Sequence, residues 1–213
     1  MTSAAGSGAA PDRLIAKLER DLEALDQPIR EWRDARERAL QKSFAQKDGR
    51  LAPLMGRLPQ AAAAAAGVGA GPRERVFAVF DELCELYARA EPRTCARLRA
   101  IVAQREARTL LAEYLSHCAR VLEQGGRAEW LDRGLAAASL DDQGRDYRDW
   151  LMSVGDLYLA ANARGLEPRP AFQRLAERSS DEKPAGGPTP TRRTLEHFEE
   201  SAYFLTSVLP RLR

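Results

Sequence analysis

The sequence contains few of the residues on which most catalytic and metal sites depend. Its 213 residues include two histidines and three cysteines. The cysteines, Cys84, Cys95 and Cys118, form no C-x-x-C pair, and no cysteine or histidine pair has the spacing of a zinc site. A Walker loop and a G-x-S-x-G elbow are also missing. The sequence therefore favours a protein that is not an enzyme and that binds no metal or cofactor.

Long hydrophobic runs are missing as well. The longest uncharged apolar stretch, residues 60–71, consists mainly of alanine and glycine and is too short to cross a bilayer. The first residues, MTSAAGSGAAPDR, have no basic region followed by an apolar core, so they do not have the pattern of a secretory signal. An odd number of cysteines leaves at least one free thiol, which is typical of a reducing compartment. We expect a cytoplasmic protein that does not act at a membrane.

Charge of one sign does not predominate either. The chain has 33 lysines and arginines against 31 acidic residues, for a formal net charge of +2. Such a balance gives no overall attraction for nucleic acids, so any binding to them would require a local basic surface. Only Lys17, Lys42, Lys47 and Lys183 are lysines. Together with the many alanines, this preference for arginine indicates a GC-rich bacterial genome.

Strand signals are absent, because β-branched residues nowhere alternate with polar ones over a sustained stretch. Apolar residues recur instead at intervals of three and four, which is typical of amphipathic helices. The sequence predicts an all-α fold, either a multi-helix bundle or a short HEAT-like helical stack. We divide the chain into a disordered N-terminus (1–10), a helical hairpin (11–48), an Ala/Gly/Pro linker (49–72), a helical core domain (73–180), a second linker (181–190) and a tethered amphipathic C-terminal helix (191–209).

The hairpin prediction depends on a proline. Leu14, Ile15, Leu18, Leu22 and Leu25 form the apolar stripe of a first helix. Pro28 suits the first turn of a second helix that ends near residue 47. Neither helix buries enough apolar surface alone, so the hairpin has to pack on the core domain, on a second copy of the chain or on a partner. We favour the core domain, and self-association through the hairpin remains open.

Residues 146–165 are predicted to form the central helix of the core domain. Tyr147, Trp150, Leu151, Val154, Leu157, Tyr158 and Ala161 occupy one side of this helix, whereas Met152, Leu159 and Ala163 occupy the opposite side. A helix that is apolar on two sides usually lies between neighbours. A second long helical stretch, residues 93–123, changes its apolar face within residues 103–109, where we expect a kink or break.

An acidic cluster accompanies the predicted central helix. It comprises Asp141, Asp142, Asp146, Asp149 and Asp156. Carboxylates at helical spacing could bind a hard cation, but the E-x-x-H pairs of helical di-metal sites do not occur in the sequence. We interpret the cluster as charge that favours a helix N-terminus, and we take Asp149 and Asp156 as candidate residues of an interaction surface.

Three arginines give a second candidate surface. Arg93, Arg97 and Arg108 would lie within about 60° of one another on an uninterrupted helix. A line of arginines is suited to a phosphate backbone, although no exposed aromatic residues accompany this one. A solvated helix face or contact with an acidic protein would explain the same pattern.

Near the C-terminus, Arg192 and His197 match the R-x4-H spacing found in HEPN ribonucleases. The all-helical fold of that family would suit this chain, and the resemblance implies that these two residues cleave RNA. The polar residue that often follows the motif's arginine is replaced here by Arg193. Arginine is so abundant that about one match of this kind is expected by chance.

Together, these patterns favour a non-enzymatic bacterial interaction protein, such as an adaptor, an immunity-type protein or an accessory subunit, whose partner is another protein. The second hypothesis is a helical subunit that binds nucleic acid through Arg93, Arg97 and Arg108. The third is a HEPN-like ribonuclease.

Overall fold

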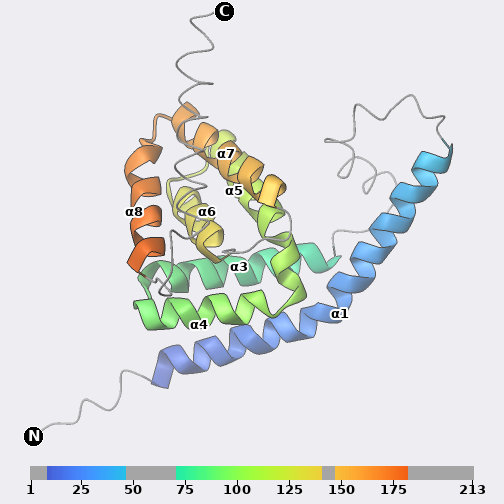
Figure 1. The fold of residues 1–213 in the computed structure, drawn as a ribbon, viewed down its shortest axis with the longest axis horizontal. Coiled ribbons are helices and arrows are strands. Elements are labelled where there is room, and N and C mark those ends of the chain that lie inside the picture. The colour runs from blue at the N-terminus through green and yellow to red at the C-terminus, as the bar shows by residue number, and fades with distance from the viewer. Residues whose placement is uncertain (1–8, 47–70, 141–146, 182–213) are drawn as a thin grey trace, which may run out of the picture.

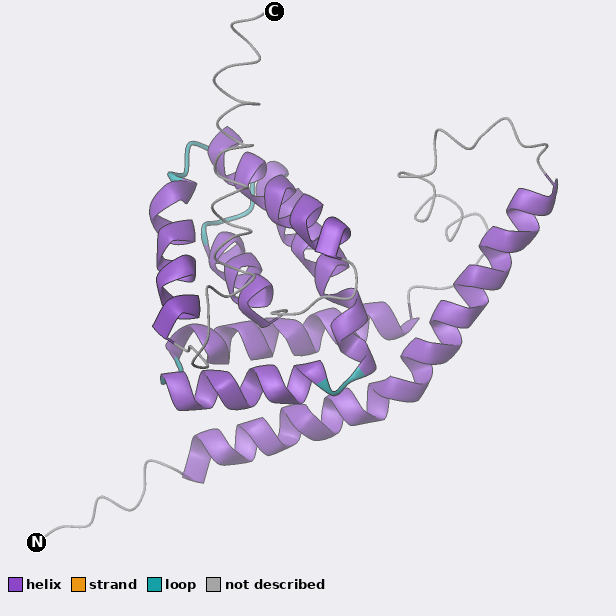
Figure 2. Cartoon of the chain, in the orientation of Figure 1, coloured by secondary structure: helices purple, strands orange, loops and turns teal. Residues whose placement is uncertain are grey.

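The computed structural model describes residues 9–46, 71–140 and 147–181 (Figure 1). In these residues every regular element is helical, and Figure 2 shows no strand among them. The elements are α1 (Ala9–Gln46), α3 (Gly71–Arg89), α4 (Pro92–Ala103), the 3-10 helix η2 (Glu106–Leu110), α5 (Leu111–Glu123), α6 (Glu129–Leu140), α7 (Tyr147–Ala163) and α8 (Pro168–Asp181). The predicted all-α fold is confirmed. Within the described ranges, no helix has the length and apolarity needed to span a membrane.

Helix α6 lies at the centre of the bundle and contacts α3, α4, α5, α7 and α8. All of residues 134–140 are buried, most of them with small side chains. A Cβ atom added at Gly134 would lie 2.5 Å from Leu157 Cδ2, so α6 and α7 approach closely at this glycine. The prediction that α7 is the central helix is therefore wrong. Small side chains allow short distances between helices but give only a weak hydrophobic signal in the sequence.

Among the described residues, only one side of α7 packs against other helices. Trp150, Val154, Leu157 and Ala161 are buried against α5, α6 and α8, as their spacing predicts. On the opposite side, Met152 and Leu159 keep 63% and 41% of their surface exposed. Within the described part of the chain, α7 is thus an edge helix and not a helix between neighbours.

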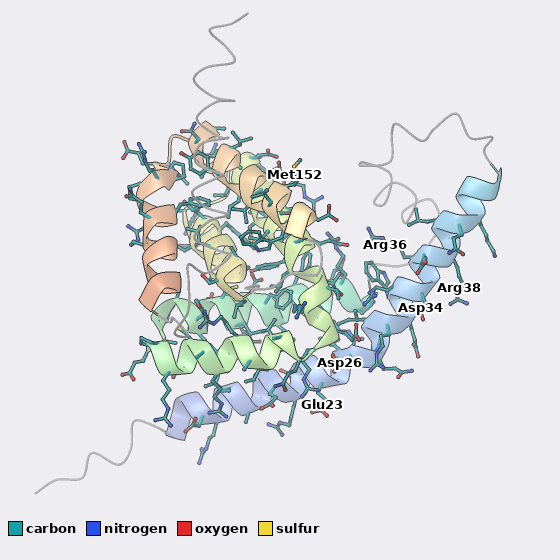
Figure 3. The ribbon with its side chains drawn as sticks, in the orientation of Figure 1. Glu23, Asp26, Asp34, Arg36, Arg38 and Met152 are labelled. Carbon is teal, nitrogen blue, oxygen red and sulfur yellow. The ribbon has the colours of Figure 1, made fainter. Side chains whose placement is uncertain are left out.

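The predicted hairpin is also wrong, because α1 is one continuous helix of 38 residues that includes Pro28. Its buried stripe, Ile15, Leu18, Leu22, Leu25, Ile29 and Trp32, keeps the same 3-4 spacing on both sides of the proline. Burial of this stripe offsets the backbone hydrogen bond that proline removes, which costs about 3 kcal/mol. The helix bends in its middle, near the residue labelled Asp26 in Figure 3. A bend at a proline is the expected accommodation.

Helix α1 packs on the core domain, which is the option that the sequence favoured. It contacts α3, α4 and η2, and its buried residues belong to the same hydrophobic core as theirs. Ion pairs along its edges join α1 to the core. They include Lys17 Nζ to Glu82 Oε2 at 2.8 Å and Arg36 Nη1 to Glu113 Oε1 at 2.6 Å. The other predicted segments, at residues 1–8, 49–70 and 182–209, lie outside the described residues.

The predicted break within residues 103–109 is confirmed. Helix α4 ends at Ala103, the backbone of Arg105 is extended, and η2 begins at Glu106. Asp26 of α1 stabilises this break, because its Oδ1 accepts a 2.8 Å hydrogen bond from the Glu106 backbone N–H. Its Oδ2 lies 3.3 Å from Arg105 Nη1. A carboxylate from a distant helix thus caps an N-terminus that has no side-chain cap of its own.

Removal of this carboxylate should destabilise the fold. In Asp26→Ala, the Glu106 N–H and the Arg105 guanidinium both lose a partly buried acceptor, which should lower the free energy of unfolding by about 1–3 kcal/mol. Asp34→Ala, at an exposed position of the same helix, is the control and should change it by less than about 0.5 kcal/mol. Urea unfolding measures both, and equal effects of the two variants would contradict the capping role.

Candidate functional site

The exposed side of α7 carries a regular stripe of five residues. Asp149, Met152, Asp156, Leu159 and Ala163 follow one another at intervals of three and four, and all five are exposed. We call them the outer stripe. The stripe is about 21 Å long at 1.5 Å per residue. It contains two of the three large hydrophobic side chains that are exposed in the described residues, and Figure 3 shows Met152 on the outer side of α7.

The inner side of α7 explains why these residues face outward. Ser153 Oγ donates a 2.8 Å hydrogen bond to the Asp149 carbonyl and accepts one from Ser116 Oγ of α5 at 3.0 Å. Ala160 and Ala161, two turns further along, are buried as well, and α7 packs closely against α5. Because the inner side is fixed by tight packing, the longer side chains at 152 and 159 have no room beneath the helix and remain on its surface.

The charge of the outer stripe is negative. Partial desolvation, and next the nearby Glu123 at the end of α5, raise the pKa of Asp156 above its ordinary value of 3.8. No ion pair found among the described residues involves Asp156. A raised carboxyl pKa means that the surroundings disfavour the ionised form, and a cation placed beside it would reverse this effect. The surface therefore combines exposed apolar groups with one carboxylate, that of Asp156, that a basic ligand would stabilise.

Of the predicted site residues, the structure brings Asp149 and Asp156 together with the exposed Met152 and Leu159. The remaining aspartates of the predicted acidic cluster, at positions 141, 142 and 146, lie outside the described residues. The sequence revealed both the acidic and the apolar residues of the stripe. It assigned the apolar residues to the core, because a period of 3.6 cannot show which of two apolar sides is covered.

The predicted arginine surface is not one continuous face. Arg93 and Arg97 lie on α4 and Arg108 on η2, with the helix interrupted between them. The prediction placed all three on an uninterrupted helix, so its geometric basis is wrong. Arg97 Nη1 also pairs with Asp12 Oδ1 of α1 at 2.9 Å. At least one of these guanidinium groups therefore helps to hold α1 on the core.

The titratable groups of the interior have structural roles. The hydroxyl of Tyr114, which is fully buried, donates a 2.5 Å hydrogen bond to Asp81 Oδ1, and Arg133 lies 3.6 Å from the same oxygen. Burial raises the pKa of the Cys118 thiol to about 12 and raises that of Cys84 as well, so both thiols are protonated and poor nucleophiles. Within the described ranges, no three metal-ligating side chains form a group.

His117 belongs to an aromatic cluster and not to a polar site. Its ring centroid lies 5.2 Å from that of Phe77 and 5.5 Å from that of Trp130. Burial, and next the neighbouring Arg120 and Arg73, lower the pKa of its imidazole. A neutral imidazole packed between two aromatic rings stabilises the contact between α3, α5 and α6.

A cleft of about 350 Å³ lies between α3, α6 and α8, where the short side chains of Ala88, Ala136 and Ala171 leave space. Its volume is within the range of small-ligand sites. Its charged lining residues, Asp132 and Arg174, have opposite signs and do not form a set of convergent groups for one kind of ligand. No pattern in the sequence indicated this cleft, because its small residues come from three distant segments.

The raised pKa of Asp156 leads to a prediction about pH. The folded state holds this proton more tightly than the unfolded state, so ionisation at neutral pH costs stability and protonation at low pH removes that cost. Asp156→Asn should therefore raise the free energy of unfolding slightly at pH 7, by less than about 1 kcal/mol because solvent screens an exposed group. The gain should vanish at pH 3. Thermal melts of Asp156→Asn and Asp34→Asn at both pH values check this, and a large loss of stability at pH 7 would refute it.

Comparison of the chain with protein-family models, with curated proteins and with solved structures finds no match. Its function therefore has to be inferred from the arrangement of its own side chains.

Proposed function

We propose that this protein is a non-enzymatic interaction module of a bacterial cytoplasm, in the role of an adaptor, immunity-type protein or accessory subunit. Its binding surface is the outer stripe of α7, and its ligand is an amphipathic helix of another protein that carries basic residues beside its apolar face. The observation that supports this most is the exposure of Met152 and Leu159 in register with Asp149 and Asp156.

The dimensions of the stripe suit a helical ligand. A partner helix of about 14 residues would run its full length of about 21 Å. Apolar residues repeating every three or four positions on that helix would contact Met152 and Leu159, which lie seven residues apart and thus on the same side of α7. Lysine or arginine residues at the edge of the helix would lie beside Asp149, Asp156 and Glu123.

The expected affinity is moderate. Complete burial of one Met or Leu side chain contributes about 1.5–3 kcal/mol, and both are partly covered already. Carboxylates at the rim of an interface mainly increase the association rate and the selectivity for a basic partner. A surface of this size and composition is typical of transient complexes and less so of permanent ones.

The alternatives have less support. The nucleic-acid hypothesis required a continuous arginine face, and Arg97 is paired with Asp12 across an interrupted helix. Arg192 and His197 of the ribonuclease hypothesis lie outside the described residues. Both hypotheses remain predictions that binding and cleavage assays with purified protein can test.

The proposed function predicts that a charge at Leu159 weakens partner binding without affecting the fold. A photo-crosslinking residue placed at Leu159 in the source cells should capture one partner protein, whereas the same residue at the exposed Ala96 of α4 should not. With the purified partner, Leu159→Glu should raise Kd at least about tenfold, equivalent to 1.4 kcal/mol. Its melting temperature should stay unchanged, because the position is on the surface.

Ala96→Glu is the matched control, since it introduces the same charge at an exposed helical position away from α7. A partner that binds Leu159→Glu and the unaltered chain with equal affinity would exclude the outer stripe as the binding surface.

A further inference from the structure

We infer that Met152 is a modification site through which a peroxide regulates the outer stripe of α7. Oxidation of its thioether to the sulfoxide makes the middle of the stripe polar and weakens the binding of a partner helix. The inference rests on the proposed function, because it concerns the same surface. It adds the chemical class of the regulator, a peroxide oxidant, and the atom on which that oxidant acts, Met152 Sδ.

Met152 has the only exposed sulfur-containing side chain among the described residues, with 63% of its surface exposed on the outer side of α7 (Figure 3). The three cysteines are all buried. Burial raises the pKa of the Cys84 and Cys118 thiols, so these groups contain little of the thiolate that attacks a peroxide. A thioether has no proton to lose, so its oxidation follows its exposure. Met152 is therefore the sulfur group of the described ranges that a peroxide reaches first.

The reaction transfers one oxygen atom and two electrons. A lone pair of Met152 Sδ attacks one oxygen of hydrogen peroxide, and the O–O bond breaks as the new S–O bond forms. The proton on the transferred oxygen passes to the departing hydroxide, which leaves as water. The sulfur is oxidised and the peroxide is reduced. Two methionine sulfoxide reductases, one for each epimer of the sulfoxide, return the product to methionine, so the modification is reversible.

The position of Met152 within the outer stripe makes its oxidation effective. Asp149 lies three residues before it, Asp156 lies four residues after it, and Leu159 follows one turn further along. The other four side chains of the stripe are carboxylates or hydrocarbons, and neither kind donates a hydrogen bond to a sulfoxide oxygen. A partner helix would remove this oxygen from water without a donor from the stripe to replace it. Binding should therefore weaken at least about tenfold.

Oxidation of Met152 should leave the fold intact. Val154 and Leu157 are fully buried on the inner side of α7, whereas Met152 does not belong to the hydrophobic core. A sulfoxide at this position stays in water and displaces no packed side chain. A loss of partner binding after oxidation would thus be a local effect at the outer stripe.

Peptide mass spectrometry of the full chain after treatment with hydrogen peroxide tests the modification site. Met152 should be oxidised at a rate within about fivefold of its rate in denaturant, because most of its side chain is exposed. Cys84, Cys95 and Cys118 should stay reduced over the same time, and the melting temperature should not change. Slower oxidation of Met152, or oxidation of a cysteine before it, would overturn the inference whatever a partner does.

The partner captured by the crosslinking residue at position 159 provides the second readout. Complete oxidation of Met152, with the peroxide removed before the partner is added, should raise Kd at least about tenfold. Treatment with both methionine sulfoxide reductases should restore the original affinity.

Met152→Leu is the matched control, because it keeps an apolar side chain at this position and removes the sulfur. The affinity of this variant should be the same before and after peroxide treatment, although Met1 and Met55 remain available for oxidation. A loss of affinity in the treated variant would assign the effect to another residue and would overturn the inference.

Leu159→Glu separates a failure of this inference from a failure of the proposed function. If Leu159→Glu loses the partner while the oxidised chain binds as tightly as the reduced chain, the outer stripe is the binding surface and the inference is wrong. If Leu159→Glu and the oxidised chain both bind as the unaltered, reduced chain does, the proposed function is wrong and so is the regulation inferred from it.

Discussion

The close approach of α6 to α7 at Gly134 is the constraint on which the arrangement of the bundle depends. A side chain at this position would meet Leu157 Cδ2 at 2.5 Å, and the small residues that follow allow α6 to contact five helices at once. Because Leu157 is held in this contact, the rotation of α7 about its own axis is fixed. The same rotation directs Met152 and Leu159 away from the bundle, so the packing of the core also determines the candidate binding surface.

A second set of contacts joins α1 to the core through charge. Asp26 caps η2 and pairs with Arg105, and Glu113 accepts hydrogen bonds from both Arg36 and Arg73. These groups are partly buried, so their loss leaves charges and a backbone N–H without an acceptor. Arg97, one of the arginines that the sequence suggested for a ligand, also pairs with α1, through Asp12. The negative outer stripe lies on α7, whose main contacts among the described helices are with α5, α6 and α8.

Several elements could be predicted from the sequence because the spacing of their apolar side chains allows only one interpretation. The break at residues 103–109 was evident from a change of apolar face, and the burial of Trp150 and Leu157 from their spacing. Pro28 misled the prediction because a local signal for a helix start was outweighed by a buried stripe that continues past it. The central position of α6 gave no clear signal, since alanine and glycine are common both in cores and in linkers. Which side of α7 remains exposed depends on packing partners distant in the sequence, and periodicity alone does not contain that information.

The contact between Gly134 and Leu157 can be tested by a double-mutant cycle measured by urea unfolding. Gly134→Ala alone should destabilise the fold by about 1–3 kcal/mol, because its methyl group overlaps the leucine side chain. In a Leu157→Ala background the same substitution should cost far less, since the space is then free, and the coupling energy should be at least about 1 kcal/mol. Additive effects of the two substitutions would contradict the account, because α7 would then not be fixed by this contact.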